Sequence, residues 1–291
     1  MKKILALIMV ALLIFCMASC AKKDSDANNT DDEGAATDNK SVIQTEKGTF
    51  EYGINEAGEY EIVKYTPKSV TTVDLELPKT TDDGRDIVGI AKEAFKADNT
   101  IKSVVIPDTY TYIGKHAFYD CDTLASVTMQ NSVTNIYEGA FQNCDSLATV
   151  TVSTALKELS AYAFSGCVAL KEVNLSGDTA IIGEAAFLGC SELTKVTLSD
   201  KLASVTKSAF LECNKLTYTV YGNAKYLGNE ANPHLALIRA TDLNIESCGV
   251  NDATVIIAKN ALSNCEALKS VKLGAALKYV NGDCFANSPW I

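Results

Sequence analysis

The 291-residue sequence is poor in basic residues, and this shortage limits the kinds of partner that it can bind. Acidic residues outnumber basic ones by 36 to 26, which leaves a formal net charge of −10. A protein that binds nucleic acid needs a basic surface to displace counterions from phosphates, and attraction to anionic lipid headgroups has the same requirement. We therefore expect neither nucleic-acid binding nor electrostatic docking on membranes.

Sequence motifs for catalysis and metal binding are also missing. The two histidines, His116 and His234, belong to no H-E-x-x-H zinc motif. The sequence has no G-x-S-x-G, P-loop or G-x-G-x-x-G motif, and its ten cysteines include no C-x-x-C pair. Cys248 is a weak candidate for a nucleophile, because no matched base accompanies it. We predict that the protein is not an enzyme and uses no metal or cofactor.

The first twenty residues have the pattern of a lipoprotein signal. A basic start at residues 2–3 precedes an uninterrupted apolar run over residues 4–15, which suits a signal peptide and is too short to span a bilayer. Small residues at 18–19 then precede Cys20, and this resembles a bacterial lipobox. An ordinary secretory signal that happens to contain a cysteine is the alternative. We predict a signal peptide over residues 1–19 and lipidation of Cys20, which would anchor the protein to the cell membrane, facing outside the cytoplasm.

The segment after the lipobox lacks the residues that a core needs. Residues 21–41 contain no aromatic residue and no apolar side chain larger than alanine, and aspartate is frequent among them. Such a segment cannot bury enough surface to offset its ordering entropy. We predict a disordered acidic tether over residues 20–48, with an acidic binding tail as the alternative. Period-two apolar alternation between turn residues then predicts an N-terminal β cap over residues 49–93.

The remaining chain is organised by a 23-residue period. Each phenylalanine of this period follows an alanine, and in all but the first repeat a cysteine comes three residues later. The phenylalanines are Phe95, Phe118, Phe141, Phe164, Phe187 and Phe210, and the cysteines are Cys121, Cys144, Cys167, Cys190 and Cys213. A fixed period of about 20–29 residues is the range of leucine-rich repeats, so we predict a stacked solenoid.

Each repeat also contains a triplet such as Val150-Thr151-Val152, in which apolar residues flank a polar one. This pattern predicts half-buried strands, and the equal spacing stacks them in parallel about 4.8 Å apart. Their outward residues form a polar face, which is a candidate for binding an extended protein partner; the alternative is that threonine merely suits strands. The candidate residues are Ser126, Thr128, Thr149, Thr151, Glu172, Asn174, Lys195, Thr197 and Tyr218.

The periodic cysteines invite a chemical interpretation, but packing accounts for them better. Stacked neighbours lie within disulfide range, yet their parallel side-chain directions and the lack of a unique mate disfavour pairing. Cysteine is small and buries readily, so we predict core thiols, with disulfides as the alternative. Asp98 and Ser288 occupy the cysteine position in the first and last repeats. We expect polar residues there because one side of a terminal repeat faces water.

The period is interrupted after Phe210. The next equivalent residue is Leu262, 52 residues later, which is one period of 23 plus 29 further residues. We therefore predict leucine-rich repeats over residues 94–221, an insertion over residues 222–260, and a final repeat with a C-terminal cap over residues 261–291.

Two apolar segments within the insertion suggest its structure. Residues 235–240 and 243–248 flank Thr241-Asp242, and we interpret them as a β-hairpin that projects from the stack or extends it. Such insertions often lie on a functional face, although a spacer hairpin is equally consistent with the pattern. Trp290, the sole tryptophan, is predicted to cover the open C-terminal end of the core.

The repeat unit A-F-x-x-C-x-x-L-x-x-V-x-[ILMV] resembles the BspA-type leucine-rich repeats of bacterial surface proteins. It departs from the standard leucine-rich repeat, in which an Asn or Cys stands where this chain has Ser132 and Ala155. The resemblance implies a β-rich solenoid of about seven to eight repeats stacked in parallel, on the cell surface or secreted. Some members of the family are adhesins for host matrix proteins or other microbes.

From the signal and the repeats together we predict a lipid-anchored cell-surface protein that acts as a protein-binding or adhesion module. Its partners would be extracellular or cell-surface proteins, which the sequence does not identify. The alternative is a structural envelope or spacing protein without a specific ligand.

Overall fold

The structure is a computed structural model, which describes residues 41–289 and 291. The predicted signal peptide, the predicted lipidation site Cys20 and Trp290 lie outside the described residues. Within them, the regular elements are short β-strands together with the 3-10 helix η1 (Lys207–Phe210). No helix in this part of the chain has the length and hydropathy that crossing a bilayer requires.

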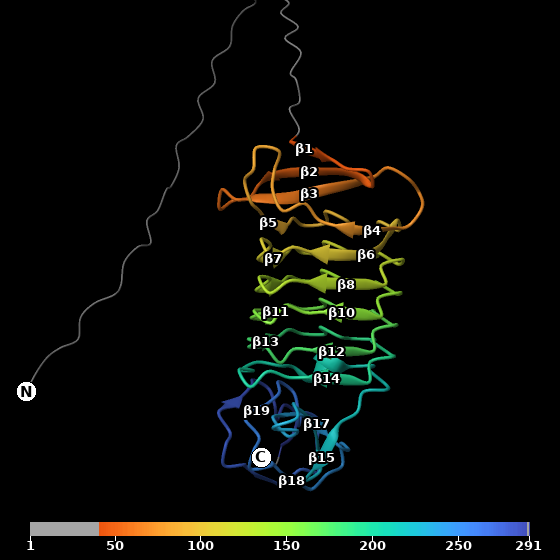
Figure 1. Ribbon diagram of the computed structural model, residues 1–291. Coiled ribbons are helices and arrows are strands. Elements are labelled where there is room, and N and C mark those ends of the chain that lie inside the picture. Colours follow the sequence, from red (N-terminus) through yellow and green to blue (C-terminus); the bar gives the residue numbers. More distant parts are fainter. Residues whose placement is uncertain (1–40, 290) are drawn as a thin grey trace, which may run out of the picture. The chain divides into compact units, whose positions relative to one another are not determined.

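Two rows of parallel strands run along the stack, as Figure 1 shows. The first row consists of β4 (Val73–Glu76), β6 (Ile101–Ile106), β8 (Ser126–Met129), β10 (Thr149–Thr151), β12 (Glu172–Asn174) and β14 (Lys195–Thr197). The second consists of β5 (Ile87–Ile90), β7 (Tyr112–Ile113), β9 (Asn135–Ile136), β11 (Glu158–Leu159) and β13 (Ile181–Ile182). Register partners such as Val127 and Val150 stand one 23-residue period apart, which confirms the predicted solenoid.

The phenylalanines of the repeat form a continuous stack inside the solenoid. The rings of Phe118 and Phe141 lie 5.2 Å apart with an interplanar angle of 5°, and those of Phe187 and Phe210 lie 5.7 Å apart at 4°. The alanine before each ring is buried as well, so the backbone of one turn lies close to the next. The repeat therefore places one large side chain per turn in the same place, where it fills the space between layers.

Three antiparallel strands precede the first parallel turn: β1 (Val42–Gln44), β2 (Gly48–Ile54) and β3 (Tyr60–Pro67). β3 pairs in parallel with β5, and the rings of Phe50 and Tyr65 lie 6.4 Å and 5.7 Å from that of Phe95. The predicted end of the tether at residue 48 is wrong, because β1 lies before it. Val42 pairs with Glu51, and Ile43 packs against the core, so apolar burial begins seven residues before the predicted start at residue 49.

The predicted hairpin between residues 235–240 and 243–248 is also wrong. The chain instead forms a meander, which we define as β15 (Thr219–Tyr221), β16 (Ala224–Leu227) and β17 (Ala236–Ala240), each antiparallel to the next. Its tight turn is Gly222-Asn223, where φ is 54° and 68°. A two-residue turn with positive φ at both positions has the twist that a hairpin needs, and Gly and Asn adopt it most readily.

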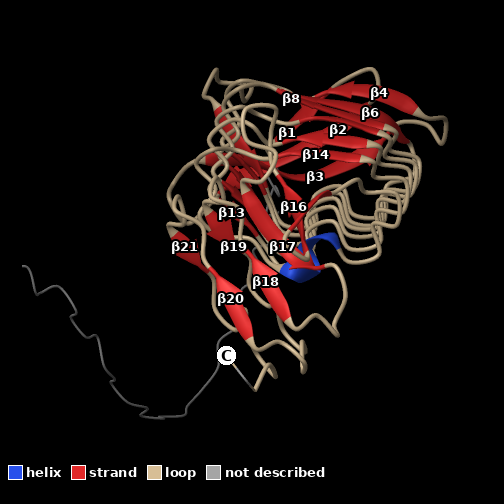
Figure 2. Cartoon of the chain, turned by 90° about the horizontal axis from the view of Figure 1, so that it is seen from below, coloured by secondary structure: helices blue, strands red, loops and turns tan. Residues whose placement is uncertain are grey.

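Parallel stacking resumes after the meander. β17 pairs in parallel with β19 (Ile256–Ile257), which pairs with β21 (Tyr279–Val280), and β18 (Ser247–Gly249) pairs with β20 (Ser270–Lys272). Figure 2, seen from below, shows β18 beside β20. Because Cys248 stands opposite Val271, one period of 23 residues later, the second half of the predicted insertion is itself a repeat.

This repeat carries unusual residues at the two diagnostic positions. Counting one period of 23 back from Leu262 and Cys265 gives Arg239 at the phenylalanine position and Asp242 at the cysteine position. The apolar pattern therefore conceals the repeat. The backbone continues the stack at a shifted register, because β17 pairs with β19 at an offset of 20 residues, with Leu237 opposite Ile257.

Candidate binding surface

The outward side chains of the first strand row form one surface. On each strand a buried valine, such as Val127 or Val173, alternates with outward residues that are half-buried or exposed. Eight of the nine predicted candidates lie here: Ser126, Thr128, Thr149, Thr151, Glu172, Asn174, Lys195 and Thr197. We call these eight residues the strand face.

Register within the strand face puts like side chains beside each other. Ser126 stands opposite Thr149, and Thr128 stands opposite Thr151, so the central strands present hydroxyl groups at each step. The charged pair Glu172 and Lys195 occupies adjacent positions on β12 and β14. The surface therefore offers hydrogen-bonding groups along its length and charge at one end.

Tyr218 is the one candidate that the structure places elsewhere. It precedes β15, packs against the core, and its hydroxyl is buried with no hydrogen-bond partner among the described residues. Burial raises the pKa of Tyr218 to about 12. The prediction extended the repeat register through this residue, but the chain departs from that register after Thr217, whose N–H still donates to the Thr194 carbonyl, to enter the meander.

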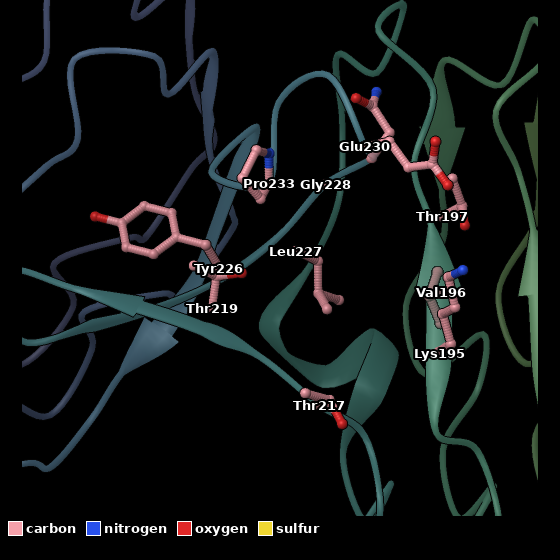
Figure 3. Close-up of a pocket in the computed structure, with 11 residues that line it drawn as sticks. Lys195, Val196, Thr197, Thr217, Thr219, Tyr226, Leu227, Gly228, Glu230 and Pro233 are labelled. Atoms are coloured by element: carbon pink, nitrogen blue, oxygen red, sulfur yellow. The ribbon is translucent and has the colours of Figure 1, made fainter.

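A pocket closes the C-terminal end of the strand face. Figure 3 shows it between β14 and the chain segment that begins at Leu227. Its volume is about 210 Å³, and it is lined by Lys195, Val196, Thr197, Thr217, Thr219, Tyr226, Leu227, Gly228, Asn229, Glu230 and Pro233. We call it the terminal pocket. An adjoining cavity of about 440 Å³ shares Lys195, Thr197, Asn229 and Glu230 with it and extends to Asn174, so the strand face and the pocket are continuous.

The loop after β16 forms the far wall of this pocket and is tied to β14. Gly228 forms a bridge with Thr197, and the backbone N–H of Leu198 donates to the Gly228 carbonyl at 3.0 Å. Asn229 Nδ2 donates to the Leu198 carbonyl at 3.1 Å. A Cβ atom at position 228 would lie 2.0 Å from the carbonyl oxygen of Asn232, so this close approach requires glycine. Sequence reasoning missed the pocket, and its only local signal was the cluster of Gly, Asn and Pro in this loop.

The cysteines of the repeat are hydrogen-bond donors within the core. All eight cysteines of the described part are free and buried. Each repeat thiol donates to the carbonyl of the phenylalanine 26 residues earlier: Cys121 to Phe95, Cys144 to Phe118, Cys167 to Phe141, Cys190 to Phe164 and Cys213 to Phe187, at 3.0–3.1 Å. Burial raises the pKa of Cys121 and Cys167 well above that of an ordinary thiol. Neutral buried thiols are poor nucleophiles, so Cys121 and Cys167 serve packing.

Burial decides two other expectations, one for Ser288 and one for Cys248. Ser288 is buried, and its Oγ donates to the Leu262 carbonyl at 2.9 Å, which is the bond that cysteine makes in other repeats. The expectation that Ser288 faces water is therefore wrong. Cys248 is 2% exposed, and burial raises its pKa to about 11, which removes it as a candidate nucleophile.

The two histidines lie in aromatic surroundings. The ring of His116 lies 5.1 Å from that of Tyr119, and the ring of His234 lies 5.9 Å from Tyr221 and 5.3 Å from Tyr226. Across residues 41–289 and 291, no three His, Cys, Asp or Glu side chains are grouped closely enough to hold a metal ion.

Comparison with known proteins places this geometry among bacterial repeat proteins. The model of the BspA type leucine rich repeat region matches residues 88–228 and 240–291 in six copies. The second range begins one residue after Arg239. No curated protein matches the chain.

Solved structures with a similar fold include two bacterial leucine-rich repeat proteins. One is a leucine rich cell surface protein from Faecalibacterium prausnitzii, at 23% identity and a TM-score of 0.54, with 88% of this chain and 82% of that chain covered. The other is a leucine-rich repeat protein from Bacteroides ovatus, at 22% identity and a TM-score of 0.50, with 85% and 80% covered. At this identity the likeness supports the fold.

Proposed function

Because the chain belongs to the family of BspA-type leucine-rich repeat proteins, we propose that it is a protein-binding module anchored on the outside of a bacterial cell. The continuity of the strand face with the terminal pocket carries this proposal. Solenoids use extended surfaces of this kind to hold protein partners, since each repeat adds one similar step to the surface.

The chemistry of the strand face suits an extended polypeptide segment. Its central residues, such as Thr128 and Thr151, are uncharged, so binding there depends on hydrogen bonds and shape, with little contribution from attraction between net charges. The strands repeat about every 4.8 Å, which offers a series of hydrogen-bonding side chains to a partner that crosses them. At the terminal pocket, Lys195 and Glu230 provide charges of both signs that can fix the direction of the bound segment.

The surface location rests on two supports. The lipobox pattern around Cys20 predicts an acyl anchor, and one of the similar solved structures is that of a cell surface protein. The predicted tether before residue 41 would hold the folded part away from the membrane. A binding scaffold of this kind needs no catalytic residues.

A binding assay with matched variants tests the proposal. The chain carrying Cys20→Ser, immobilised on a sensor, would be exposed to purified extracellular-matrix and bacterial surface proteins. A saturable partner should lose at least tenfold in affinity when Thr151→Arg and Thr197→Arg are introduced together, because two bulky cations then obstruct the strand face. The control pair Ser146→Arg and Asn214→Arg adds the same charge at exposed turn residues outside the strand face.

The alternative predicts a different result. If no protein binds saturably at any salt concentration, the chain is a spacing protein of the envelope. If the control pair weakens binding as much as the strand-face pair, the partner does not use the strand face.

A further inference from the structure

A basic cavity lies where the meander meets η1. Its volume is about 280 Å³, and its lining includes Lys207 from η1, Lys225 from β16 and Arg239 from β17, with Asp242 as the one acidic residue. Three cations thus converge on one small cavity of a chain whose net charge is −10. We call this the basic cavity, and none of its residues belongs to the strand face or the terminal pocket.

Two of these cations oppose each other directly. Lys225 and Arg239 are register partners on antiparallel strands, and the register shifts immediately after Lys225. Like charges opposite each other across a sheet are destabilising, and irregularities of this kind are frequent beside functional sites. The arrangement therefore has an unfavourable electrostatic energy that a bound anion would relieve.

No carboxylate of the described part of the chain forms an ion pair with any of the three cations. Asp242, the one carboxylate at the cavity, is held by the turn, where its Oδ1 accepts a hydrogen bond from the backbone N–H of Asn244 at 2.7 Å. Some other lysines, such as Lys215 and Lys269, do pair with a glutamate of the neighbouring turn. The basic cavity differs from other unpaired positions in that three cations line the same small cavity.

Arg239 is the central residue of the site. Its guanidinium carbon lies 4.9 Å from the centre of the Tyr218 ring. Its Nε is buried and has no hydrogen-bond partner among the described residues. The ammonium of Lys225 lies 5.9 Å from the same ring. A buried charged donor without an acceptor is costly, and guanidinium geometry matches the paired oxygens of an oxyanion.

We propose that the basic cavity binds a tetrahedral oxyanion, a phosphate or sulfate group carried by a small molecule or a glycan. Three cations against one carboxylate leave an excess of positive charge, which favours such a group over a neutral ligand. The cavity is large enough for the oxyanion and the first part of the molecule that carries it. This site is independent of the strand face, so either site can be tested without the other.

Titration calorimetry on the purified full-length chain tests this site with inorganic phosphate, inorganic sulfate, a hexose 6-phosphate and a hexosamine 6-sulfate, against chloride at equal ionic strength. We expect phosphate or sulfate to bind more tightly than chloride. The sugar ester that binds more tightly shows whether the natural ligand carries a phosphate or a sulfate group. The double variant Lys225→Gln with Arg239→Gln should weaken binding at least tenfold. The control Lys157→Gln with Lys278→Gln removes the same charge at exposed positions and should change it less than twofold.

If the double variant does not fold, the melting temperature of the single variant Lys225→Gln provides the test instead. Without an oxyanion, this variant should melt at or above the wild-type temperature, because the repulsion with Arg239 is removed. Phosphate or sulfate should raise the melting temperature of the wild type more than that of Lys225→Gln. Equal heats and melting temperatures in chloride, phosphate and sulfate would refute the site, as would equal losses in the basic-cavity and control variants.

Discussion

Phe141 lies in the middle of the phenylalanine stack and offers a direct test of what holds the solenoid together. Its side chain is fully buried, between Phe118 and Phe164, with both ring centroids at 5.2 Å and interplanar angles of 5° and 4°. Replacement by alanine removes the ring and leaves a cavity between two turns. Because a solenoid is stabilised by contacts between neighbouring repeats, this single change weakens two interfaces at once.

The expected loss follows from burial and stacking. Phenylalanine-to-alanine changes in packed cores cost about 3–5 kcal/mol, and each aromatic pair contributes about 0.5–1.5 kcal/mol beyond its buried area. Since Phe141 takes part in two such pairs, we expect a loss near the upper end, about 4–5 kcal/mol. Phe285 occupies the same repeat position near the C-terminal end and is only half-buried. Phe285→Ala should therefore cost roughly 1 kcal/mol.

Equilibrium unfolding in urea, followed by circular dichroism and by a second probe, measures both variants. Coincident transitions would show that the stack unfolds as one unit, so that the two free energies can be compared. Two results would refute the reasoning: a loss below about 1.5 kcal/mol for Phe141→Ala, or equal losses for the two variants. Either would mean that the stacked rings are not the main contact between turns.

Four other predictions follow from the structure and the sequence. Cys144→Ala should destabilise the fold by about 1–3 kcal/mol in urea unfolding, because a backbone carbonyl loses its donor, whereas Cys144→Ser should cost less, since serine makes this bond in the last repeat. Gly228→Ala should lower the melting temperature and abolish binding at the terminal pocket, while Gly282→Ala, whose Cβ meets no atom within 4 Å, should change neither. Cys20→Ser should release the protein from the membrane fraction of cells, and persistent attachment would contradict the lipobox. Burial raises the pKa of Cys248 to about 11, so the folded state keeps a proton that the unfolded chain loses above about pH 8.5. The free energy of unfolding should therefore fall as pH rises between those values. A free energy of unfolding that does not change over this range would contradict the prediction.

The strand face could be predicted from the sequence because the direction of a side chain on a strand depends only on its position along that strand. Alternation along a strand fixes which side chains point outward, and the 23-residue period fixes which of them become neighbours. Eight of the nine predicted residues accordingly lie together. The prediction for Tyr218 is wrong because this residue stands where the 23-residue period ends. Beyond that point the period no longer indicates which side chains become neighbours.

The terminal pocket and the basic cavity depend on contacts that no period describes. The pocket requires the loop at Gly228 to return against Thr197, and the basic cavity requires Lys225 to stand opposite Arg239 while Lys207 approaches from η1. The sequence Gly222-Asn223 is typical of a hairpin turn. The hairpin was nevertheless predicted between residues 235–240 and 243–248, because these segments are more apolar. Arg239 and Asp242 then concealed a repeat in which β17 pairs with β19 at an offset of 20 residues instead of 23.

The sequence by itself determined the stacked repeat, its 23-residue spacing, the buried cysteines and the outward polar residues. It could do so because identical units that each bury one phenylalanine have few ways to pack other than directly on one another. Tertiary structure alone decided where the stack is interrupted, how the meander pairs, and which charges meet around Arg239. Those contacts join residues of different repeats whose side chains do not follow the pattern, so their energies appear only once the chain has folded.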